Sequence, residues 1–381
     1  MVNIDFVSIL LFLGMGQCVF LIGSTLFSRQ RGHTANLLLM ALLFAFLWFQ
    51  LEFFLIRHTL DTQIPFIYST RYGAWLIIGP LILLYNRTSI IKDYLLKKKD
   101  FLHFLPFLLF TILLPLLLKD IITNRSTDYG MLTVFDNFNR EQITVRHYFY
   151  AFIFVFQFVH ALIYIFIAYR ETNNYLQLAK QLQSSIPDNK VNTLRYLYIT
   201  AIVIILLCSG FVIYQFSTSL WQRNLDYLYV LPTLIFVFGL AYRAMRYPNS
   251  VLLLEADEKK EKYARSSLAD SAKSGYLKLL EQQLEKEMIY RNNELRLSDL
   301  AKELDMSTHH LSQLINEEKQ QNFFDFINSY RIREAKEKIA NDKSRTLLDI
   351  AFEVGFNNKN SFNSAFKKHV GMTPSMYRKT N

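Results

Sequence analysis

Four side chains that could carry a charge or bind a ligand lie inside apolar stretches of the first 250 residues: Glu52, Arg71, Gln157 and His160. A charged side chain at the centre of a bilayer costs about 2.5 to 3.5 kcal/mol, so such groups are usually paired or functional. Glu52 and Arg71 lie near corresponding ends of two consecutive stretches. They could form an ion pair, or a site for a small molecule or an envelope signal. Gln157 and His160 are expected to hydrogen-bond between helices, with a role in binding as the alternative.

The stretches that hold these residues are long enough to cross a membrane. The chain is 51% hydrophobic, and a helix needs roughly 20 apolar residues to span the ~30 Å hydrocarbon core. Both cysteines, Cys18 and Cys208, lie inside such stretches, which argues against a disulfide framework or a metal site. We predict a seven-helix transmembrane bundle within residues 1–247, with spans near 6–27, 35–56, 66–85, 101–120, 147–168, 196–216 and 227–245.

The loops between these windows predict the orientation of the chain. Lys and Arg are concentrated in every second loop, for example at Lys97, Lys98 and Lys99, and the positive-inside rule places these loops in the cytoplasm. With seven spans, the N-terminus faces outward and the chain from Arg243 onward lies in the cytoplasm, beneath a bacterial inner membrane. The N-terminal MVNIDF has no basic residue before a long apolar run, so we expect the run to remain as an anchor.

The composition changes abruptly after Pro248. Residues 248–268 are rich in charge and are predicted to be a connector, which could be stiff or slack. Apolar residues at helical spacing then predict an amphipathic helix over 269–288, namely Leu277, Leu280, Leu284 and Met288. The net charge of +10 does not by itself indicate a nucleic-acid partner, but residues 319–381 hold 12 Lys and Arg against 6 Asp and Glu.

The stretch RLSDLAKELDMSTHHLSQLIN, residues 296–316, predicts two short helices separated by a turn. Ser298 and Ser307 suit the capping positions, and Ala301 allows the two helices to cross closely. The inward side chains are expected to be Leu300, Ala301, Leu304, Leu311, Leu314 and Ile315. Asp305 stands at the turn, where glycine is the usual residue of a helix-turn-helix unit.

A similar pattern returns about fifty residues later in LLDIAFEVGFNNKNSFNSAFKKHV. Gly355 supplies the turn, and the inward residues are expected to be Ile350, Ala351, Val354, Phe362, Ala365 and Phe366. Between the two pairs, a helix of about 19 residues would span roughly 28 Å, close to the ~34 Å that separates successive major grooves. Its predicted inward residues are Phe323, Ile327, Tyr330, Ile332, Ala335 and Ile339, with ion pairs Arg333/Glu337 and Glu334/Lys338 on its surface. The whole chain is therefore predicted to be all-α.

Residues 264–381 resemble the DNA-binding domain of the AraC/XylS family, in the version joined to a multi-helix membrane region. The resemblance rests on LSDLAKELDMSTHHLSQLIN, NFFDFINSYRIREAK, IAFEVGF, SFNSAFKKHVGMTP and the closing Pro374 to Arg378, in this order. It implies two helix-turn-helix units in a domain over 269–381, control of transcription, and a homodimer on double-stranded DNA. No cofactor is implied.

The resemblance also assigns roles to individual residues. The outward positions of the first recognition helix are Thr308, His309, Ser312 and Gln313, and those of the second are Lys359, Asn360, Asn363 and Ser364. Asn can bond adenine in bidentate fashion and Lys can reach guanine, so the second set is better suited to base reading. Phosphate contacts are expected from Arg345, Lys367, Lys368 and Arg378. His309 and His310 are not expected to bind a metal, because adjacent helical residues point apart.

The sequence favours a membrane-anchored transcription regulator over two other classes of function. An enzyme, such as a receptor with a kinase module, is disfavoured because the tail has no glycine-rich phosphate loop. The alternative is a multi-span transporter or lipid-handling protein with a regulatory cytoplasmic tail. Clear inverted repeats or several intramembrane charges would favour it, and the sequence presents neither.

Overall fold

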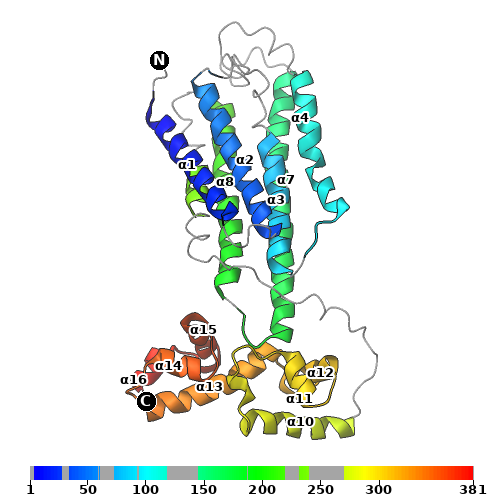
Figure 1. The fold of residues 1–381 in the computed structure, drawn as a ribbon, viewed down its shortest axis with the longest axis vertical. Coiled ribbons are helices and arrows are strands. Elements are labelled where there is room, and N and C mark those ends of the chain that lie inside the picture. The colour runs from blue at the N-terminus through cyan, green and yellow to red at the C-terminus, as the bar shows by residue number, and fades with distance from the viewer. Residues whose placement is uncertain are drawn as a thin grey trace. The chain divides into compact units, whose positions relative to one another are not determined.

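The computed structural model describes residues 4–27, 34–58, 60, 73–91, 94–117, 145–186, 188–218, 231–239 and 270–380. Over these ranges the chain is helical and contains no extended strand, in agreement with the all-α prediction. The chain divides into two compact units, and Figure 1 shows the helices of both. The first comprises Met1–Thr172 and Asn192–Leu253, and the second comprises Asn173–Val191 and Leu254–Asn381. The predicted connector, 248–268, lies outside the described residues.

The first unit contains a helix in each of the seven predicted windows. These are α1 (Phe6–Leu26), α2 (Thr34–Arg57), α3 (Ala74–Ile90), α4 (Leu105–Leu117), α7 (Val145–Leu182), α8 (Asp188–Thr218) and a helical turn at 231–239. Two helical segments, Phe6–Leu26 and Thr34–Leu55, are long and apolar enough to cross a membrane, within the described part of the chain. The other five windows do not meet that test there, so a seven-span bundle remains a prediction.

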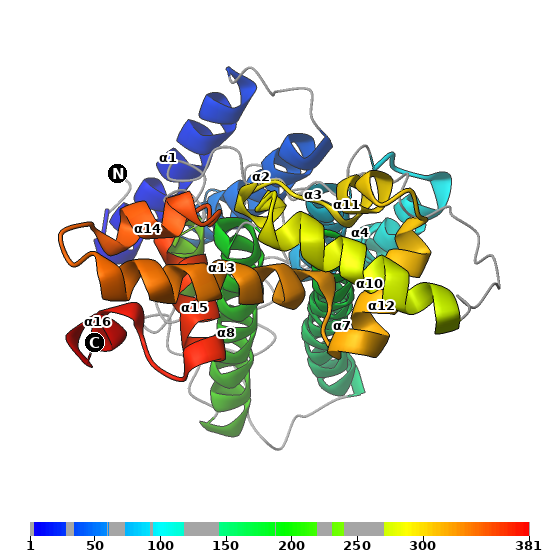
Figure 2. The same cartoon turned by 90° about the horizontal axis from the view of Figure 1, so that it is seen from below.

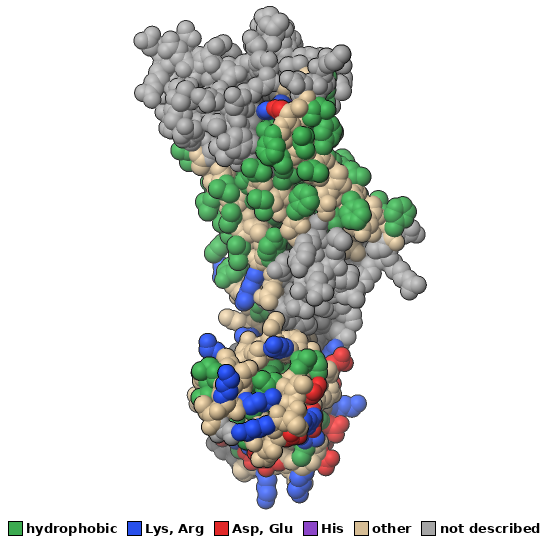
Figure 3. Space-filling view, turned by 90° about the vertical axis from the view of Figure 1, so that its left-hand side faces the viewer, with side chains coloured by type: hydrophobic (Ala, Val, Ile, Leu, Met, Phe, Trp, Pro, Cys, Tyr) green, Lys and Arg blue, Asp and Glu red, His purple; other side chains and the backbone are tan. Residues whose placement is uncertain are grey.

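Large apolar side chains lie on the surface of this first unit. Phe6, Phe20, Phe152, Phe166 and Ile199 are each more than half exposed. Figure 3 shows apolar side chains gathered over this unit, whereas Lys, Arg, Asp and Glu side chains are frequent on the second. Extended apolar surfaces mark contact with lipid or with another protein.

The second unit is built around two small cores, one for each helix pair. Its helices are α10 (Asp270–Glu285), η7 (Ile289–Arg291), α11 (Leu297–Glu303), α12 (Thr308–Lys319), α13 (Phe323–Asn341), α14 (Leu347–Glu353), α15 (Lys359–Val370) and α16 (Pro374–Thr380). Helices α10 to α12 and the first half of α13 enclose one core, and the rest of α13 with α14 and α15 encloses the other. All the inward side chains predicted for α11 to α15 are buried.

Three local predictions in this unit are wrong. Helix α10 ends at Glu285, and Met288 is exposed in a left-handed conformation rather than facing inward. Ser298 does not cap α11, because the helix begins at Leu297 and Ser298 lies inside it. The Asp299 carboxylate accepts instead from the Arg296 backbone N–H at 3.0 Å, at the start of the helix. Arg333 pairs with Glu285 of α10 at 3.4 Å and not with Glu337, because the neighbouring helix offers a carboxylate as well.

Candidate nucleic-acid interface

The first helix pair, α11 and α12, has the geometry of a helix-turn-helix unit. Ala301 is buried where the helices cross, and the Ser307 hydroxyl caps α12 by accepting from the His310 backbone N–H at 3.1 Å. Asp305 occupies the turn with φ of +52°, so the left-handed conformation expected of glycine is adopted by an aspartate. Asp is among the few residues that tolerate this conformation.

The second pair, α14 and α15, is joined by residues 354–358, a turn one residue longer than residues 304–307 of the first pair. Thr346 caps α14, and the Asn358 side chain caps α15 by accepting from the Ser361 backbone N–H at 2.8 Å. Gly355 has φ of +98°, and a β-carbon there would lie 2.8 Å from the backbone oxygens of Tyr290 and Arg291. Glycine is therefore required at position 355 for two reasons, which are its backbone conformation and the close approach of another segment.

Helix α13 joins the two helix-turn-helix pairs. It runs from the α11–α12 pair to the α14–α15 pair, as Figure 2 shows. Its 19 residues correspond to roughly 28 Å, as predicted. Asn322 caps the N-terminus of α13 by accepting from the Asp325 backbone N–H at 2.9 Å. The buried residues of α13 contribute to both cores. The spacing of the two pairs is thus set by one continuous helix.

The predicted base-reading residues of α12 lie on its outer side but are partly engaged within the domain. The Gln313 amide donates to Glu317 at 2.8 Å, and the Ser312 hydroxyl accepts from Asn316 at 3.4 Å. The ring of the exposed His309 lies 5.9 Å from that of His310. Thr308 is the first residue of the helix and is half-buried.

The corresponding residues of α15 have no such partners. Lys359, Asn360 and Ser364 are exposed and Asn363 is half-buried, and none of these side chains forms a hydrogen bond or ion pair with the described residues. Capping is performed instead by Asn358, immediately before the helix. The donors and acceptors of α15 are therefore available to an external partner, and base reading by this helix stays a prediction.

The predicted phosphate contacts occupy varied environments. Lys367 is exposed and forms no ion pair with the described residues, whereas Lys368 pairs with Asp325 at 2.7 Å and Arg345 pairs with Glu353 at 2.6 Å. Two guanidinium nitrogens of Arg378, Nε and Nη2, are shielded from solvent with no hydrogen-bond partner among the described residues. Of these four side chains, Lys367 is both exposed and without an ion pair to the described residues; the roles of all four remain predictions.

Residues 300–380 match the family model described as a helix-turn-helix domain. This segment is therefore similar to known helix-turn-helix domains. The probable transcription factor PqrA of Proteus vulgaris is 29% identical over 111 residues, which are 29% of this chain and 86% of PqrA. The melibiose operon regulatory protein of Escherichia coli (strain K12) is 29% identical over 85 residues, which are 22% of this chain and 28% of that protein.

A solved structure is also similar to this helix-turn-helix domain. It is the C-terminal domain of the two-component response regulator yesN from Fusobacterium nucleatum, with 29% sequence identity, 28% of this chain and 98% of that chain covered, and a TM-score of 0.24. These similarities each cover less than a third of this chain, so they concern one domain.

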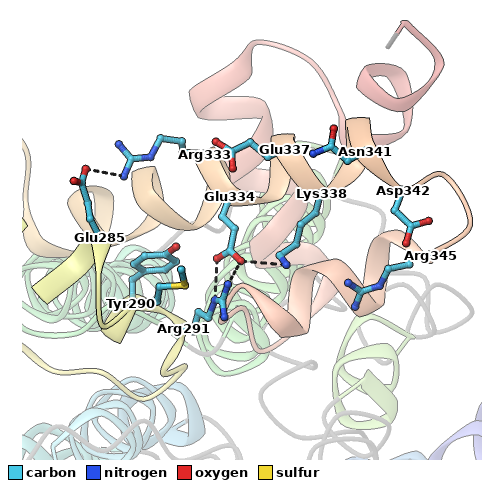
Figure 4. Close-up of a pocket in the computed structure, with 11 residues that line it drawn as sticks. Glu285, Tyr290, Arg291, Arg333, Glu334, Glu337, Lys338, Asn341, Asp342 and Arg345 are labelled. Atoms are coloured by element: carbon cyan, nitrogen blue, oxygen red, sulfur yellow. Dashed lines mark hydrogen bonds and ion pairs between the residues drawn. The ribbon is translucent and has the colours of Figure 1, made fainter. Parts of the chain in front are cut away.

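A polar groove lies on the helix-turn-helix domain beside α13, with a volume of about 620 Å³ (Figure 4). Several of its charges are paired: Glu334 contacts Arg291 and, at 3.3 Å, Lys338. Lys338 also bonds Glu353 at 2.8 Å, which raises the pKa of Lys338 and lowers that of Glu353. These ion pairs connect α13 to α14 and to η7, whereas Glu337, which also lines the groove, has no hydrogen bond or ion pair with the described residues.

The predicted signal-site residues are only partly described. Glu52 and Gln157 are fully buried, and His160 is half-buried with its ring 4.8 Å from that of Tyr164. Arg71 lies outside the described residues, so the predicted ion pair with Glu52 stays a prediction. The Gln157 amide has no hydrogen-bond partner among the described residues, so the interhelical bond predicted for it is absent there.

A buried charged residue of the domain was not predicted from the sequence. Arg331, in the middle of α13, has 0% exposure, and burial lowers its pKa to about 10, which still leaves it charged at pH 7. Its position between the buried Tyr330 and Ile332 was the available indication, since an inward arginine is rarely fully buried without acceptors.

Proposed function

We propose that the chain is a membrane-anchored, sequence-specific transcription regulator that binds double-stranded DNA through both helix-turn-helix units. The observation that carries the proposal is the geometry of the second compact unit, in which α13 joins two capped recognition helices. In α15, the side chains of Lys359, Asn360 and Asn363 form no hydrogen bond or ion pair with the described residues. The likeness to PqrA and to the melibiose regulator supports control of transcription. A homodimer on DNA would extend the reading to further grooves.

The N-terminal unit is proposed to be a seven-span anchor and sensor in a bacterial inner membrane. Two apolar helices of sufficient length, and the apolar surface of the first unit, support insertion in lipid. In this arrangement the N-terminus faces outward and the helix-turn-helix domain lies in the cytoplasm. A signal at or outside the membrane would then alter how the domain binds a promoter.

Two experiments test this function. Full-length protein in lipid nanodiscs should bind duplex DNA with an affinity that falls steeply as salt rises, because each phosphate contact releases counterions. Absence of binding, or an affinity that does not change with salt, would contradict DNA binding. A reporter that is active only in the cytoplasm should be active when it is fused after Asn381, and inactivity there would contradict the proposed topology.

A further inference from the structure

The segment that joins α7 to α8 packs against the helix-turn-helix domain. Residues 173–186 belong to the same compact unit as the domain, although α7 begins in the apolar unit. Leu182 packs against the first core, and Ser184 and Ile186 are buried. We call residues Gln183–Ile186 the hairpin tip. The tip therefore contacts the domain without being adjacent to it in sequence.

Arg331 is the centre of this contact. Its Nη1 donates to the Ser184 carbonyl oxygen at 3.0 Å and its Nη2 to the Ser184 hydroxyl at 3.1 Å. Three further bonds go to Tyr290, Asn292 and Asn328, so the five donors of the guanidinium meet five acceptors. A buried arginine requires this set, and Ser184 supplies two of its members.

The other contacts of the tip lie at the starts of DNA-binding elements. The Ser184 backbone N–H donates to the Leu295 carbonyl at 3.1 Å, and Gln183 forms an isolated bridge with Arg296, immediately before α11. On the other side, the Asn357 amide donates to the Ser185 hydroxyl at 2.9 Å, two residues before α15. The tip thus touches both helix-turn-helix units.

Helix α7 is held firmly just before it reaches the domain. Thr172 donates to the Asn86 side chain at 2.8 Å, and Glu171 pairs with Arg87 at 2.7 Å. From Thr172 to Leu182 the helix continues without a break over roughly 15 Å. Helix α7 therefore runs unbroken from these contacts to the residue before the hairpin tip.

We propose that the hairpin tip is an intramolecular clasp that masks the start of the second recognition helix and must release before duplex DNA is bound. The N-terminal residues of a recognition helix contact base edges, so DNA needs the space beside Asn357 that the tip occupies. This inference rests on the proposed DNA-binding function and assigns its regulation to α7 and the tip. The path through α7 and the tip is then a second link, beside the connector at 248–268, between the apolar unit and DNA binding.

A disulfide lock tests the clasp in the full-length protein. Ser185→Cys and Asn357→Cys are introduced together, in a background where the buried Cys18 and Cys208 are replaced by Ala. Oxidation should form the cross-link, and the locked protein should bind a mixed-sequence duplex of about 30 base pairs at low salt at least tenfold more weakly than the reduced protein. Each single-cysteine variant is the control and should not respond to oxidant.

The outcomes separate the clasp from the proposed function. If no cross-link forms, or if locked and reduced proteins bind DNA equally, the clasp is overturned while DNA binding stands. Tighter binding by the locked form would also overturn it. If neither form binds any duplex, the proposed function fails and the clasp fails with it.

A second variant loosens the contact instead of locking it. Ser184→Ala removes one acceptor of Arg331 and the bond from the Ser184 hydroxyl to the Leu295 carbonyl, 2.8 Å long. DNA binding by the full-length protein should become tighter, by about tenfold for the loss of one charge-assisted bond. Ser344→Ala, an exposed change on the same domain, is the matched control and should leave binding unchanged. Weaker or unchanged binding by Ser184→Ala would contradict the clasp.

Discussion

Replacing Gly355 by alanine should destabilise the helix-turn-helix domain far more than the same change at Gly371. Both glycines have positive φ, +98° and +82°, so alanine at either position bears a conformational cost of about 1 to 2 kcal/mol. At Gly371 the new β-carbon meets nothing within 4 Å. At Gly355 it would lie 2.8 Å from two backbone oxygens, which cannot rotate away, and such overpacking adds about 1 to 3 kcal/mol.

The expected difference between the two variants is therefore about 1 to 3 kcal/mol. For a domain of this size, each kcal/mol shifts the melting temperature by about 4 °C, so Gly355→Ala should melt roughly 4 to 12 °C below Gly371→Ala. The assay is thermal unfolding of fragment 270–381, followed by circular dichroism at 222 nm.

Equal melting temperatures for the two variants would refute the reasoning. They would mean that residues 290 and 291 do not approach the turn as closely as described, and the link between η7 and the second helix pair would be lost. A fall in both variants to the same low value would lead to the same conclusion. Wild-type fragment measured at the same concentration supplies the reference.

Three further predictions concern other parts of the domain. Asn363→Ala should relax sequence preference by about 1 to 3 kcal/mol at one base pair, as measured by selection from a randomised duplex library, and unchanged selectivity would remove Asn363 from the base-reading set. Arg331→Met leaves the carbonyls of Tyr290 and Asn292 without their donor and should lower the free energy of unfolding of fragment 270–381 by about 2 to 4 kcal/mol. The control Arg333→Met, at an exposed ion pair, should lower it by less than about 1 kcal/mol. Equal losses of the two variants in denaturant titrations would contradict this prediction. Burial lowers the pKa of His369 below 6.5, so the unfolded chain binds the proton more readily and stability should fall as pH drops below about 6.5; a His369→Gln variant with the same loss would show that another group is responsible.

The helix pairs could be predicted from the sequence because their information is local. Helical spacing of Leu300, Ala301 and Leu304, or of Phe362, Ala365 and Phe366, follows from the period of 3.6, and all six residues are buried. Capping by Ser307 depends on a residue three positions away. The length of α13 could be predicted for the same reason.

Contacts between distant segments could not be predicted in this way. The acceptors of Arg331 include Ser184, 147 positions earlier, and no periodicity connects the two residues. Arg333 bonds Glu285 instead of the Glu337 available on its own helix, since packing against α10 decides between them. Asp305 is a different case. Glycine is the usual residue at its position, yet Asp305 adopts the left-handed backbone conformation that the turn requires.

The central claim is that this chain reads DNA from the membrane, and a genome-wide footprint of the native protein tests it most directly. Cells are cross-linked, the membrane fraction is isolated, and DNA that co-purifies with the full-length chain is sequenced. The account predicts a small set of promoter fragments that share a motif with half-sites about 10 base pairs apart, depleted when Asn360 and Asn363 are replaced by Ala. Recovery of no enriched sequence from the membrane fraction, with the protein present there, would contradict it.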